Sequence, residues 1–461
     1  MKKTWLSFLT FCTTLVVTSS AFGLTDEEVF RNCRFNLINP GARSLAMGGA
    51  FISLADDATA AQANPAGLSY LGRPEFFAEY RYVDNASRAS ILRETLPPDI
   101  DTFVATGTDL ADRNSPTFIG LVSQLGENWR IGVSRQEVLN TRNSTVSSFA
   151  FSFPSPPSVF VVQGSGSIDV KATNYNASAG YRISDRLAVG GSLAYSTLSV
   201  RSEVTNFIVD TGHTVADHEI LEPTLDLRTS IHDHDTDYAF NLGLIYNVPS
   251  QNLTFAAVYR RAPKFTVREH IDPQGPDTNA DSFPDSGIDT RKKRNIVACA
   301  PTARCAFGNT FHLPDSYGVS ESWSGQKLTI SQDFERIEYR DLLEGYVPGI
   351  NILTGADARF TVKDAWEYHF GAEYVLKARA PIALRGGLFT EHDSTIRAAS
   401  TGTDAFATPA SFPGRRRDTE IHVTAGAGIV WGGEGLYKLD GAIDRAGSAN
   451  EYLVSFIFRG K

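Results

Sequence analysis

The chain has 461 residues, of which 42% are hydrophobic, 11% aromatic and 21% charged, and its formal net charge is −9 at pH 7. This acidic balance argues against nucleic acid as a partner, because a phosphate-binding surface needs an excess of Lys and Arg. No apolar stretch approaches the roughly 20 residues that a membrane-spanning helix requires. Composition therefore leaves two classes, a soluble protein and a membrane β-barrel, in which only every second residue faces lipid.

Residues 1–23 are predicted to be a secretory signal peptide. Two lysines at positions 2 and 3 precede a mostly apolar run and then a group of small residues, which is the order of an export signal. We place the cleavage after Gly23, with Ala21 as the alternative. The mature chain is thus expected to leave the cytoplasm.

The cysteines are few and fit that compartment. Cys299 and Cys305 lie in CAPTARC, and in an oxidising environment their spacing predicts one local disulfide. Metal binding by the pair is the lesser alternative. Cys33 has no partner in this scheme, and we interpret it as a buried free thiol.

Within residues 24–75, the stretch 39–71 is small, irregular and rich in Gly and Ala, unlike the rest of the chain, whereas 24–38 is polar and mixed and is expected to enter the lumen as a short helical segment. One or two helical turns are expected over 43–50, ending at Gly48. The acidic pair that ends at Asp57 can cap a second short helix, which Pro65 then stops. This region does not have the alternation of a strand.

Alternation with a period of two residues predicts about fourteen strands between residue 76 and the end of the chain. An even number is typical of single-chain bacterial barrels. The apolar face of each strand would meet lipid, with aromatic residues at the membrane interfaces. The predicted strands are 76–84, 116–125, 128–138, 169–182, 186–200, 236–248, 251–262, 311–323, 326–340, 363–377, 381–391, 419–431, 436–444 and 450–458.

Short and long links alternate along this series. Turns of a few residues, such as Gly126-Glu127 and Ser184-Asp185, are separated by much longer connections. An outer-membrane barrel has this asymmetry, with tight periplasmic turns and long outer loops, whereas a soluble sandwich has no reason for it. The sequence therefore predicts an all-β, transmembrane, antiparallel barrel (76–461) with an N-terminal segment (24–75) in its lumen. The long links are 85–115, 139–168, 201–235, 263–310, 341–362 and 392–418.

Several short motifs, in this order, resemble the FadL family of outer-membrane long-chain fatty acid transporters. They are SLAMGG (44–49), NPAGL (64–68), LPDSY (313–317), ISQDFERIEYRD (330–341), KDAW (363–366) and LRGG (384–387). The resemblance implies a Gram-negative outer-membrane barrel, monomeric in a bilayer with lipopolysaccharide, whose N-terminal hatch blocks the lumen. It also implies passive transport of hydrophobic molecules without a cofactor, with lateral exit beside the hatch. The chain departs from the usual pattern in ending on FRGK rather than on an aromatic residue.

The motif Asn64-Pro65-Ala66-Gly67 is our candidate gate. A plug of small residues can shift locally at low cost, because few large side chains interlock. The alternative is that this motif is only a rigid turn that lets the hatch fold.

Two cations are predicted to face the lumen, where a carboxylate ligand would need one. Alternation places Arg260 and Arg385 opposite the apolar faces of their strands. As an equally supported alternative, they pair with lumenal Glu367, Glu373 or Asp333 as structural ion pairs.

The loop DTNADSFPDSGID offers spaced oxygen ligands at Asp277, Asn279, Asp281 and Asp285, somewhat like a calcium loop. It lacks the central Gly and the final Glu of an EF-hand, so a solvated acidic loop is the preferred interpretation and no metal is assigned. No nucleophile or phosphate-loop motif stands out, so no catalytic residue and no enzymatic activity are expected.

Long-chain fatty acids are the leading substrate in this interpretation. The first alternative is uptake of aromatic or alkane hydrocarbons. The second is a non-transporting scaffold subunit of a secretion machinery, a role that FadL-like barrels also have.

Overall fold

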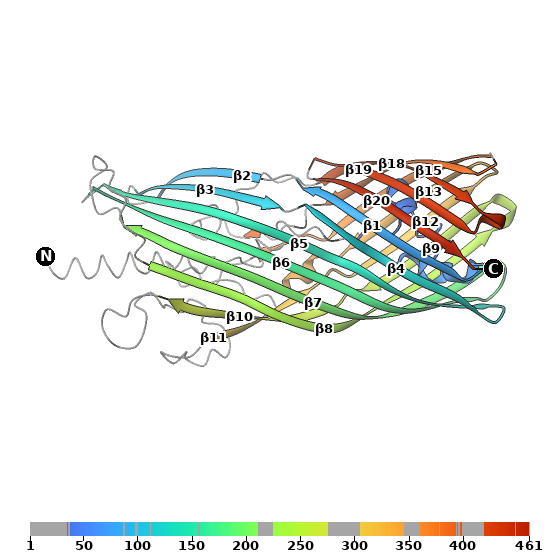
Figure 1. The fold of residues 1–461 in the computed structure, drawn as a ribbon, viewed down its shortest axis with the longest axis horizontal. Coiled ribbons are helices and arrows are strands. Elements are labelled where there is room, and N and C mark those ends of the chain that lie inside the picture. Colours follow the sequence, from blue (N-terminus) through green and yellow to red (C-terminus); the bar gives the residue numbers. More distant parts are fainter. Residues whose placement is uncertain are drawn as a thin grey trace.

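The computed structural model describes residues 35, 37–85, 88–96, 100–110, 112–154, 157–210, 225–274, 305–344, 360–377, 379–392, 394, 397–398, 419–447 and 449–460. The strands, labelled as in Figure 1, are β1 (Glu75–Asn85), β2 (Arg88–Leu96), β3 (Ile100–Leu110), β4 (Arg113–Leu125), β5 (Trp129–Pro154), β6 (Pro157–Arg182), β7 (Leu187–Asp210), β8 (Leu225–Val248), β9 (Leu253–Arg261), β10 (Lys264–Gln274), β11 (Cys305–His312), β12 (Ser316–Ser324), β13 (Leu328–Ile337), β14 (Phe360–Thr361), β15 (Ala365–Leu376), β16 (Ile382–His392), β17 (Arg397–Ala398), β18 (Thr419–Trp431), β19 (Tyr437–Arg445) and β20 (Ala449–Arg459). The helices are α3 (Ala42–Ala46), α4 (Ala60–Ala63), η1 (Pro65–Tyr70), η2 (Pro249–Gln251), η3 (Tyr339–Leu343) and η5 (Gly433–Gly435).

Fourteen of these strands form a closed antiparallel barrel. The closure joins β1 to β20, with Glu75 opposite Arg459 and Asn85 opposite Ala449. Closure leaves no edge with unpaired N–H and C=O groups, which is the condition for a sheet to cross lipid. The barrel strands in ring order are β1, β4, β5, β6, β7, β8, β9, β12, β13, β15, β16, β18, β19 and β20.

The barrel prediction is confirmed, and each of the fourteen predicted strands overlaps one barrel strand. The C-terminus lies at the end of the barrel with the short turns (Figure 1), which we call the short-turn end. The opposite end is called the long-loop end. The turn at η2 includes Asn252, which has a positive φ of 55° and lets the chain reverse between β8 and β9.

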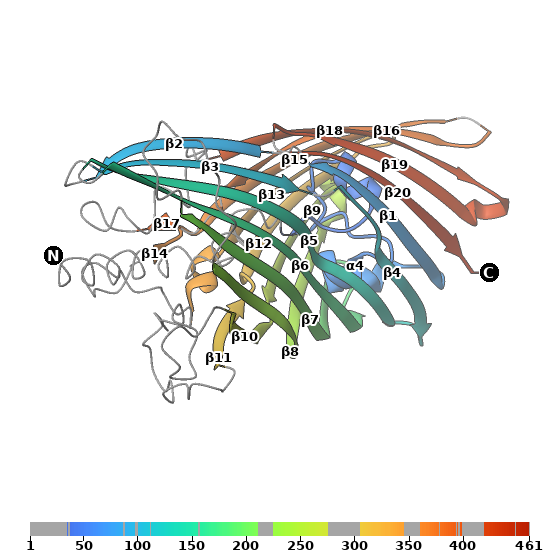
Figure 2. The same ribbon diagram turned by 60° about the vertical axis from the view of Figure 1, so that its left-hand side comes forward.

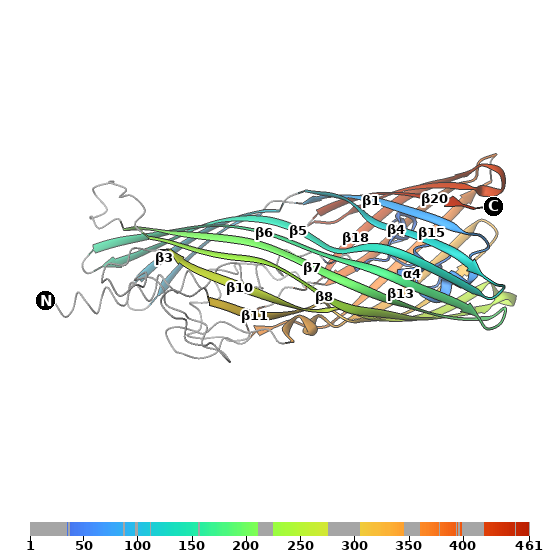
Figure 3. The same ribbon diagram turned by 60° about the horizontal axis from the view of Figure 1, so that its bottom comes forward.

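The prediction that 139–168 and 85–115 are loops was wrong. The first range is a continuation of β5 and β6, which pair as far as Pro154 opposite Pro157. The second range holds β2 and β3, and β3 pairs with the outer half of β5. Parts of 201–235 and 263–310 likewise belong to β7, β8, β10 and β11. These strands extend the sheet beyond the barrel at the long-loop end (Figure 3). They were missed because a strand outside lipid needs no apolar face.

Exposed aromatic side chains form two groups on the barrel surface. The interfaces of a bilayer favour Trp and Tyr, which are apolar in the ring and polar at the edge. The described residues contain no helix that is long and apolar enough to span a membrane. Of the exposed Trp and Tyr residues, the group near the short-turn end is Trp129, Tyr246, Trp323, Tyr374 and Trp431, and the group toward the long-loop end is Tyr80, Tyr82, Tyr175, Tyr195, Tyr238, Tyr259, Tyr317 and Trp366.

Residues 37–74, here called the lumenal segment, lie inside the barrel near the short-turn end (Figure 2). α3 contacts β16, β18, β19 and β20, whereas η1 contacts β5, β6, β7 and β8. The segment thus touches both sides of the wall. α3 ends before Gly48, which has a φ of 64°, as the sequence predicts. α4 begins two residues later than expected, after Asp57 accepts a hydrogen bond from the Thr59 amide.

Some predictions fall outside the described residues. These are the signal peptide and its cleavage site, Cys33, Cys299, and the acidic loop with Asp277, Asn279, Asp281 and Asp285. Cys305 begins β11, but its side chain is outside the described set, so the disulfide stays a prediction.

Candidate functional site

Asn64 and Pro65 rest on a patch of barrel wall that has no side chains. Gly180, Gly190 and Gly243 are direct neighbours across β6, β7 and β8. A Cβ added to Gly190 would lie 2.2 Å from the carbonyl carbon of Pro65, and one added to Gly243 would lie 2.0 Å from Asn64 Oδ1. The backbone of the motif therefore packs directly on the backbone of the wall. We call this patch the first glycine seat.

The Asn64 side chain is fully buried and joins three parts of the molecule. Its Nδ2 donates to the carbonyl oxygens of Ile52, at 3.1 Å, and Leu244, at 3.3 Å. Its Oδ1 accepts from the Ala66 amide at 3.2 Å, at the start of η1. Gly67 is equally tight, since a Cβ there would lie 1.9 Å from the carbonyl oxygen of Ala55. These contacts fix the motif to both the segment and the wall.

A second glycine seat lies across the lumen and holds the turn after α3. A Cβ on Gly371 would lie 2.2 Å from the Met47 carbonyl oxygen, and one on Gly387 would lie 2.3 Å from the Gly48 nitrogen. Gly371 and Gly387 are opposite each other on β15 and β16. The Gly48 amide also donates to Thr424 Oγ1 at 3.1 Å. The lumenal segment is therefore seated at two separate places.

Wall side chains accept hydrogen bonds from backbone amides of the segment. Asp333 Oδ2 accepts from Phe51 at 2.8 Å and from Ile52 at 3.0 Å. Glu75 Oε1 accepts from Ala58 at 2.7 Å. Such charge-assisted bonds satisfy irregular backbone that would otherwise be buried without partners. From the sequence we considered Asp333 only as an ion-pair partner. Its inward position in β13 was the signal that could have indicated a contact with the lumenal segment.

Arg260 faces the lumen, as predicted, and there it meets both a carboxylate and the segment. Its Nη1 lies 2.7 Å from Glu335 Oε2. Its Nη2 donates to Asn39 Oδ1 and to the Ala63 carbonyl oxygen, both at 2.8 Å. Arg260 thus holds the chain just before the candidate gate.

Arg385 also faces the lumen and lies between two carboxylates. Its Nε is 2.6 Å from Glu373 Oε2, and its Nη1 is 2.7 Å from Asp440 Oδ1. Arg43 of the segment shares Glu373, with Nε at 3.0 Å. Both predicted arginines therefore have the ion-pair geometry that the sequence offered as the alternative to ligand binding, although only Glu373 was among the partners considered.

A pocket opens into the lumen on the long-loop side of the segment. Phe389 forms part of it, stacked against His422 with ring centroids 4.1 Å apart. The charged groups of the lining are mostly acidic, with two arginines among them. The lining residues are Phe35, Leu37, Ile38, Arg81, Val83, Arg113, Ser115, Thr117, Glu137, Asn140, Tyr339, Glu367, Phe389, Glu391, Ser394, His422, Asp444 and Glu451.

An apolar cluster covers the inner wall next to this pocket. The lumen of a diffusion porin is polar, so buried aliphatic and aromatic side chains on inward positions are unusual. Phe35 and Leu37, which line the pocket, pack against the cluster. We call it the apolar wall, and it consists of Val138, Leu139, Ile168, Val170, Ala172, Leu198, Val200, Phe265, Phe311, Leu313, Ile337, Tyr339, Leu342, Val362 and Ala365.

The pocket reaches a seam where β4 and β5 separate. Their described ladder ends at Phe118 opposite Gln136. β5 resumes pairing on that side at Asn143, with β3, so the described pairs include none between β4 and 137–142. The β5–β6 register also shifts after Glu137, which is a β-bulge. Side chains of both strands at this seam line the pocket.

Fold and site together define a class, the outer-membrane β-barrel channels with a segment folded into the lumen. The family model described as outer membrane protein transport protein (OMPP1/FadL/TodX) matches residues 36–401. The chain therefore belongs to the OMPP1/FadL/TodX family of outer-membrane channels for hydrophobic compounds.

Solved structures agree with this fold. A Pseudomonas aeruginosa FadL homologue superimposes with a TM-score of 0.64 at 12% identity, covering 92% of this chain and 99% of the other. The toluene transporter TbuX of Ralstonia pickettii gives 0.53 at 16% identity, with 92% and 100% covered. The toluene transporter TodX of P. putida gives 0.53 at 14% identity, with 92% and 99% covered. A search of curated protein sequences finds no match.

Proposed function

We propose that this protein conducts hydrophobic molecules inward across the outer membrane by passive diffusion, with the lumenal segment as its hatch. The observation that carries the proposal is the apolar wall beside the pocket. A hydrophobic molecule gains about 25 cal/mol for each Å² of its surface that leaves water, so an apolar lining gives it a favourable path. The two glycine seats close the way straight through.

The path that we propose ends at the seam between β4 and β5. Ser115 and Glu137 line the pocket from opposite sides of the seam, and one hydrogen bond of 2.6 Å joins them. Separation of β4 from β5 at the seam would break side-chain contacts but none of the described backbone hydrogen bonds of the sheet. A hydrophobic molecule in the pocket would leave laterally into the membrane, beside the hatch.

Of the two substrate classes, the pocket favours uncharged hydrocarbons over long-chain fatty acids. Arg260 and Arg385, the cations that a fatty acid carboxylate was expected to use, are already in ion pairs. More carboxylates than arginines line the pocket, and a carboxylate headgroup would add to that negative charge. Fatty acids are the second candidate, and their headgroup would have to compete for Arg81 of the lining with Glu79 and Glu451, which already pair with it.

Uptake by cells tests this function. Cells with and without the protein, at matched expression, would receive labelled toluene and labelled oleate in separate assays. Faster uptake of toluene supports the first class and faster uptake of oleate alone supports the second. If the protein changes the uptake of neither compound and co-purifies with protein partners, both transport hypotheses are wrong and the scaffold role replaces them.

The gate is tested in the same cells by replacing Asn64, Pro65 and Ala66 in a barrel that still folds. Uptake at the normal rate would show that the motif is only a rigid turn and not the gate. We also propose that the protein acts as a monomer in a membrane with lipopolysaccharide, because the closed ladder leaves no barrel edge for a second copy.

A further inference from the structure

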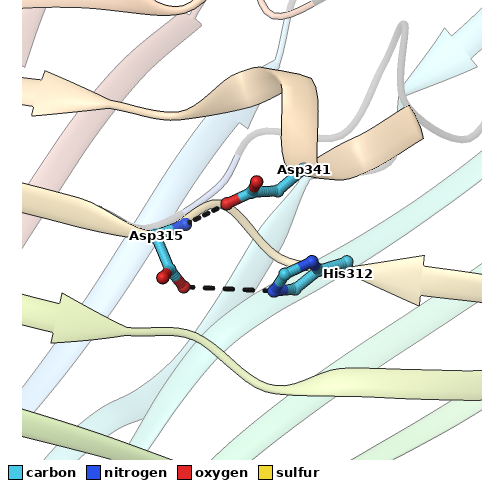
Figure 4. A group of neighbouring side chains, drawn as sticks. All are labelled: His312, Asp315 and Asp341. Carbon is cyan, nitrogen blue, oxygen red and sulfur yellow. Dashed lines mark hydrogen bonds and ion pairs between the residues drawn. The ribbon is translucent and has the colours of Figure 1, made fainter. Parts of the chain in front are cut away.

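Three side chains with metal-binding atoms converge at the long-loop end of the barrel (Figure 4). They are His312 at the end of β11, Asp315 in the link to β12, and Asp341 in η3. One ligand atom from each lies within 4.8 Å of the other two. None of the three belongs to the lumenal segment, the glycine seats or the pocket lining.

His312 is the residue that points to a ligand. It is 9% exposed, and its Nδ1 lies 2.8 Å from Glu344 Oε2. A carboxylate only accepts, so Nδ1 is the donor in this bond, and Nε2 is the ring nitrogen that remains for another ligand. Lys264 donates a hydrogen bond to Glu344 Oε1, so each oxygen of this carboxylate has one donor and its orientation toward His312 is held.

The Nε2 atom of His312 faces the Asp315 carboxylate without a direct bond to it. Nε2 is buried and has no hydrogen-bond partner among the described residues. It lies 3.9 Å from Asp315 Oδ1, which is too long for a direct hydrogen bond. A metal ion bound to Nε2 would therefore lie beside this carboxylate, which would supply a second ligand atom. Histidines that bind a metal through one ring nitrogen usually donate a hydrogen bond from the other to a carboxylate, as His312 does to Glu344.

The two aspartates are held in position by the surrounding chain. Asp315 accepts from the Tyr259 hydroxyl at 2.9 Å and from the Ala262 amide at 2.8 Å. The Asp315 amide donates to Asp341 Oδ2 at 3.0 Å. Each carboxylate oxygen has two lone pairs, so these bonds orient the carboxylates and leave room for a metal.

We propose that His312, Asp315 and Asp341 bind one divalent first-row transition ion, with Zn²⁺ as the best fit. One imidazole nitrogen and two carboxylate oxygens suit Zn²⁺, whereas Ca²⁺ and Mg²⁺ prefer oxygen ligands alone. Tetrahedral bonds of about 2.1 Å put ligand atoms about 3.4 Å apart. The widest pair, within 4.8 Å, therefore closes by side-chain rotation, and water takes the fourth position.

The ion would join two separate pieces of the chain at the long-loop end, the link between β11 and β12 and the helix η3. Phe311 and Leu313, on either side of His312, and Leu342, next to Asp341, all belong to the apolar wall. Bound metal would thus fix the outer part of that wall. This inference does not depend on which hydrophobic molecule the channel carries.

The test is a zinc titration of the full chain, folded in detergent and stripped with a chelator. Isothermal calorimetry should give one ion per chain. His312→Asn and Asp341→Asn should each abolish that binding, and Glu344→Gln should weaken it by about 10- to 100-fold. The control is His234→Gln, which removes an exposed histidine on β8 and should leave binding unchanged.

Three results would overturn the proposal. They are the absence of saturable binding by the wild-type barrel, equal binding by the His312→Asn and Asp341→Asn variants, and displacement of zinc by excess Ca²⁺. The Co²⁺ absorption spectrum of the wild-type protein is a check that needs no variant, since one nitrogen and oxygens in a tetrahedral site give intense visible bands. A weak octahedral spectrum would count against the site.

Discussion

Gly190→Ala is the most direct perturbation of the hatch, because the added methyl group meets only backbone. The new Cβ would lie 2.2 Å from the carbonyl carbon of Pro65 and 2.3 Å from the Ala66 nitrogen, whereas ordinary contacts begin at 3.4 Å. Neither atom belongs to a flexible side chain, so the motif must move away by about 1 Å. The adjacent Gly191 supplies a matched control, since its Cβ would meet the nearest atoms at 3.7 Å.

The magnitude follows from the cost of overpacking, about 1–3 kcal/mol, with the upper part of that range expected for a contact with backbone. If the cost falls on the seated state alone, the unseated state gains by about 5- to 150-fold. Gly190→Ala should therefore raise ion leakage through the purified channel and accelerate hydrocarbon uptake, whereas Gly191→Ala should change neither.

Planar-bilayer conductance of the refolded proteins measures the leak, and gel mobility before and after heating shows whether each barrel has closed. Equal conductance of well-folded Gly190→Ala and Gly191→Ala proteins would refute the first glycine seat as the closing contact. Gly387→Ala and Gly386→Ala form an independent pair at the second seat, because their added Cβ atoms would lie 2.3 Å and 3.9 Å from the nearest atoms.

Three further predictions concern single side chains. Arg385→Met removes the cation that Glu373 and Asp440 share, but Arg43 stays beside Glu373 and Lys438 beside Asp440. The unfolding temperature in detergent should therefore fall, at a cost below the roughly 3–5 kcal/mol of a fully uncompensated buried charge, and Asp440→Asn should restore part of it. A ligand-anchoring arginine would instead lower oleate binding without a loss of stability. Asn64→Asp keeps the acceptor for η1 but loses both donated bonds, so the leak should rise, with about 1–3 kcal/mol lost. The unfolded, unreduced mature chain should titrate one thiol, Cys33, and three after reduction; three thiols before reduction would exclude the disulfide.

The barrel strands were predictable because lipid forces a period of two onto each of them. β18 begins and ends at the predicted residues 419 and 431, where lipid-facing Ile421 and Val423 alternate with buried His422 and Thr424. A shift of one residue would reverse every one of these side chains. The outer halves of β5 to β8 have no such constraint, since they lie beyond the aromatic groups, and their alternation was too weak to distinguish them from loops.

The candidate site was predictable in its residue types and much less in its partners. Alternation alone turned Arg260 and Arg385 inward. Their partners depend on which strands lie side by side and in which register, and Glu335 lies on β13, two strands away from Arg260 on β9. The glycine seats depend on register in the same way. Gly180 and Gly190 are ten residues apart across a short turn, but Gly243 is distant in the sequence, and the three become one patch through the pairing register of β6, β7 and β8.

The two seats differ in what lies beside them, and this difference places the moving part of the hatch. η1, which follows the first seat, contacts β5, the strand that separates from β4 at the seam. Beside the second seat, on β15 and β16, Arg43 of the segment forms an ion pair with Glu373 of the wall, and a buried pair would cost several kcal/mol to break. Release at the first seat costs backbone packing, the hydrogen bonds of Asn64 and the bond from Arg260 to the Ala63 carbonyl oxygen, all of which water can replace, and it leaves the Arg260–Glu335 pair within the wall intact. Opening at the first seat while the second stays closed is therefore the less costly motion, and it leads from the pocket to the seam.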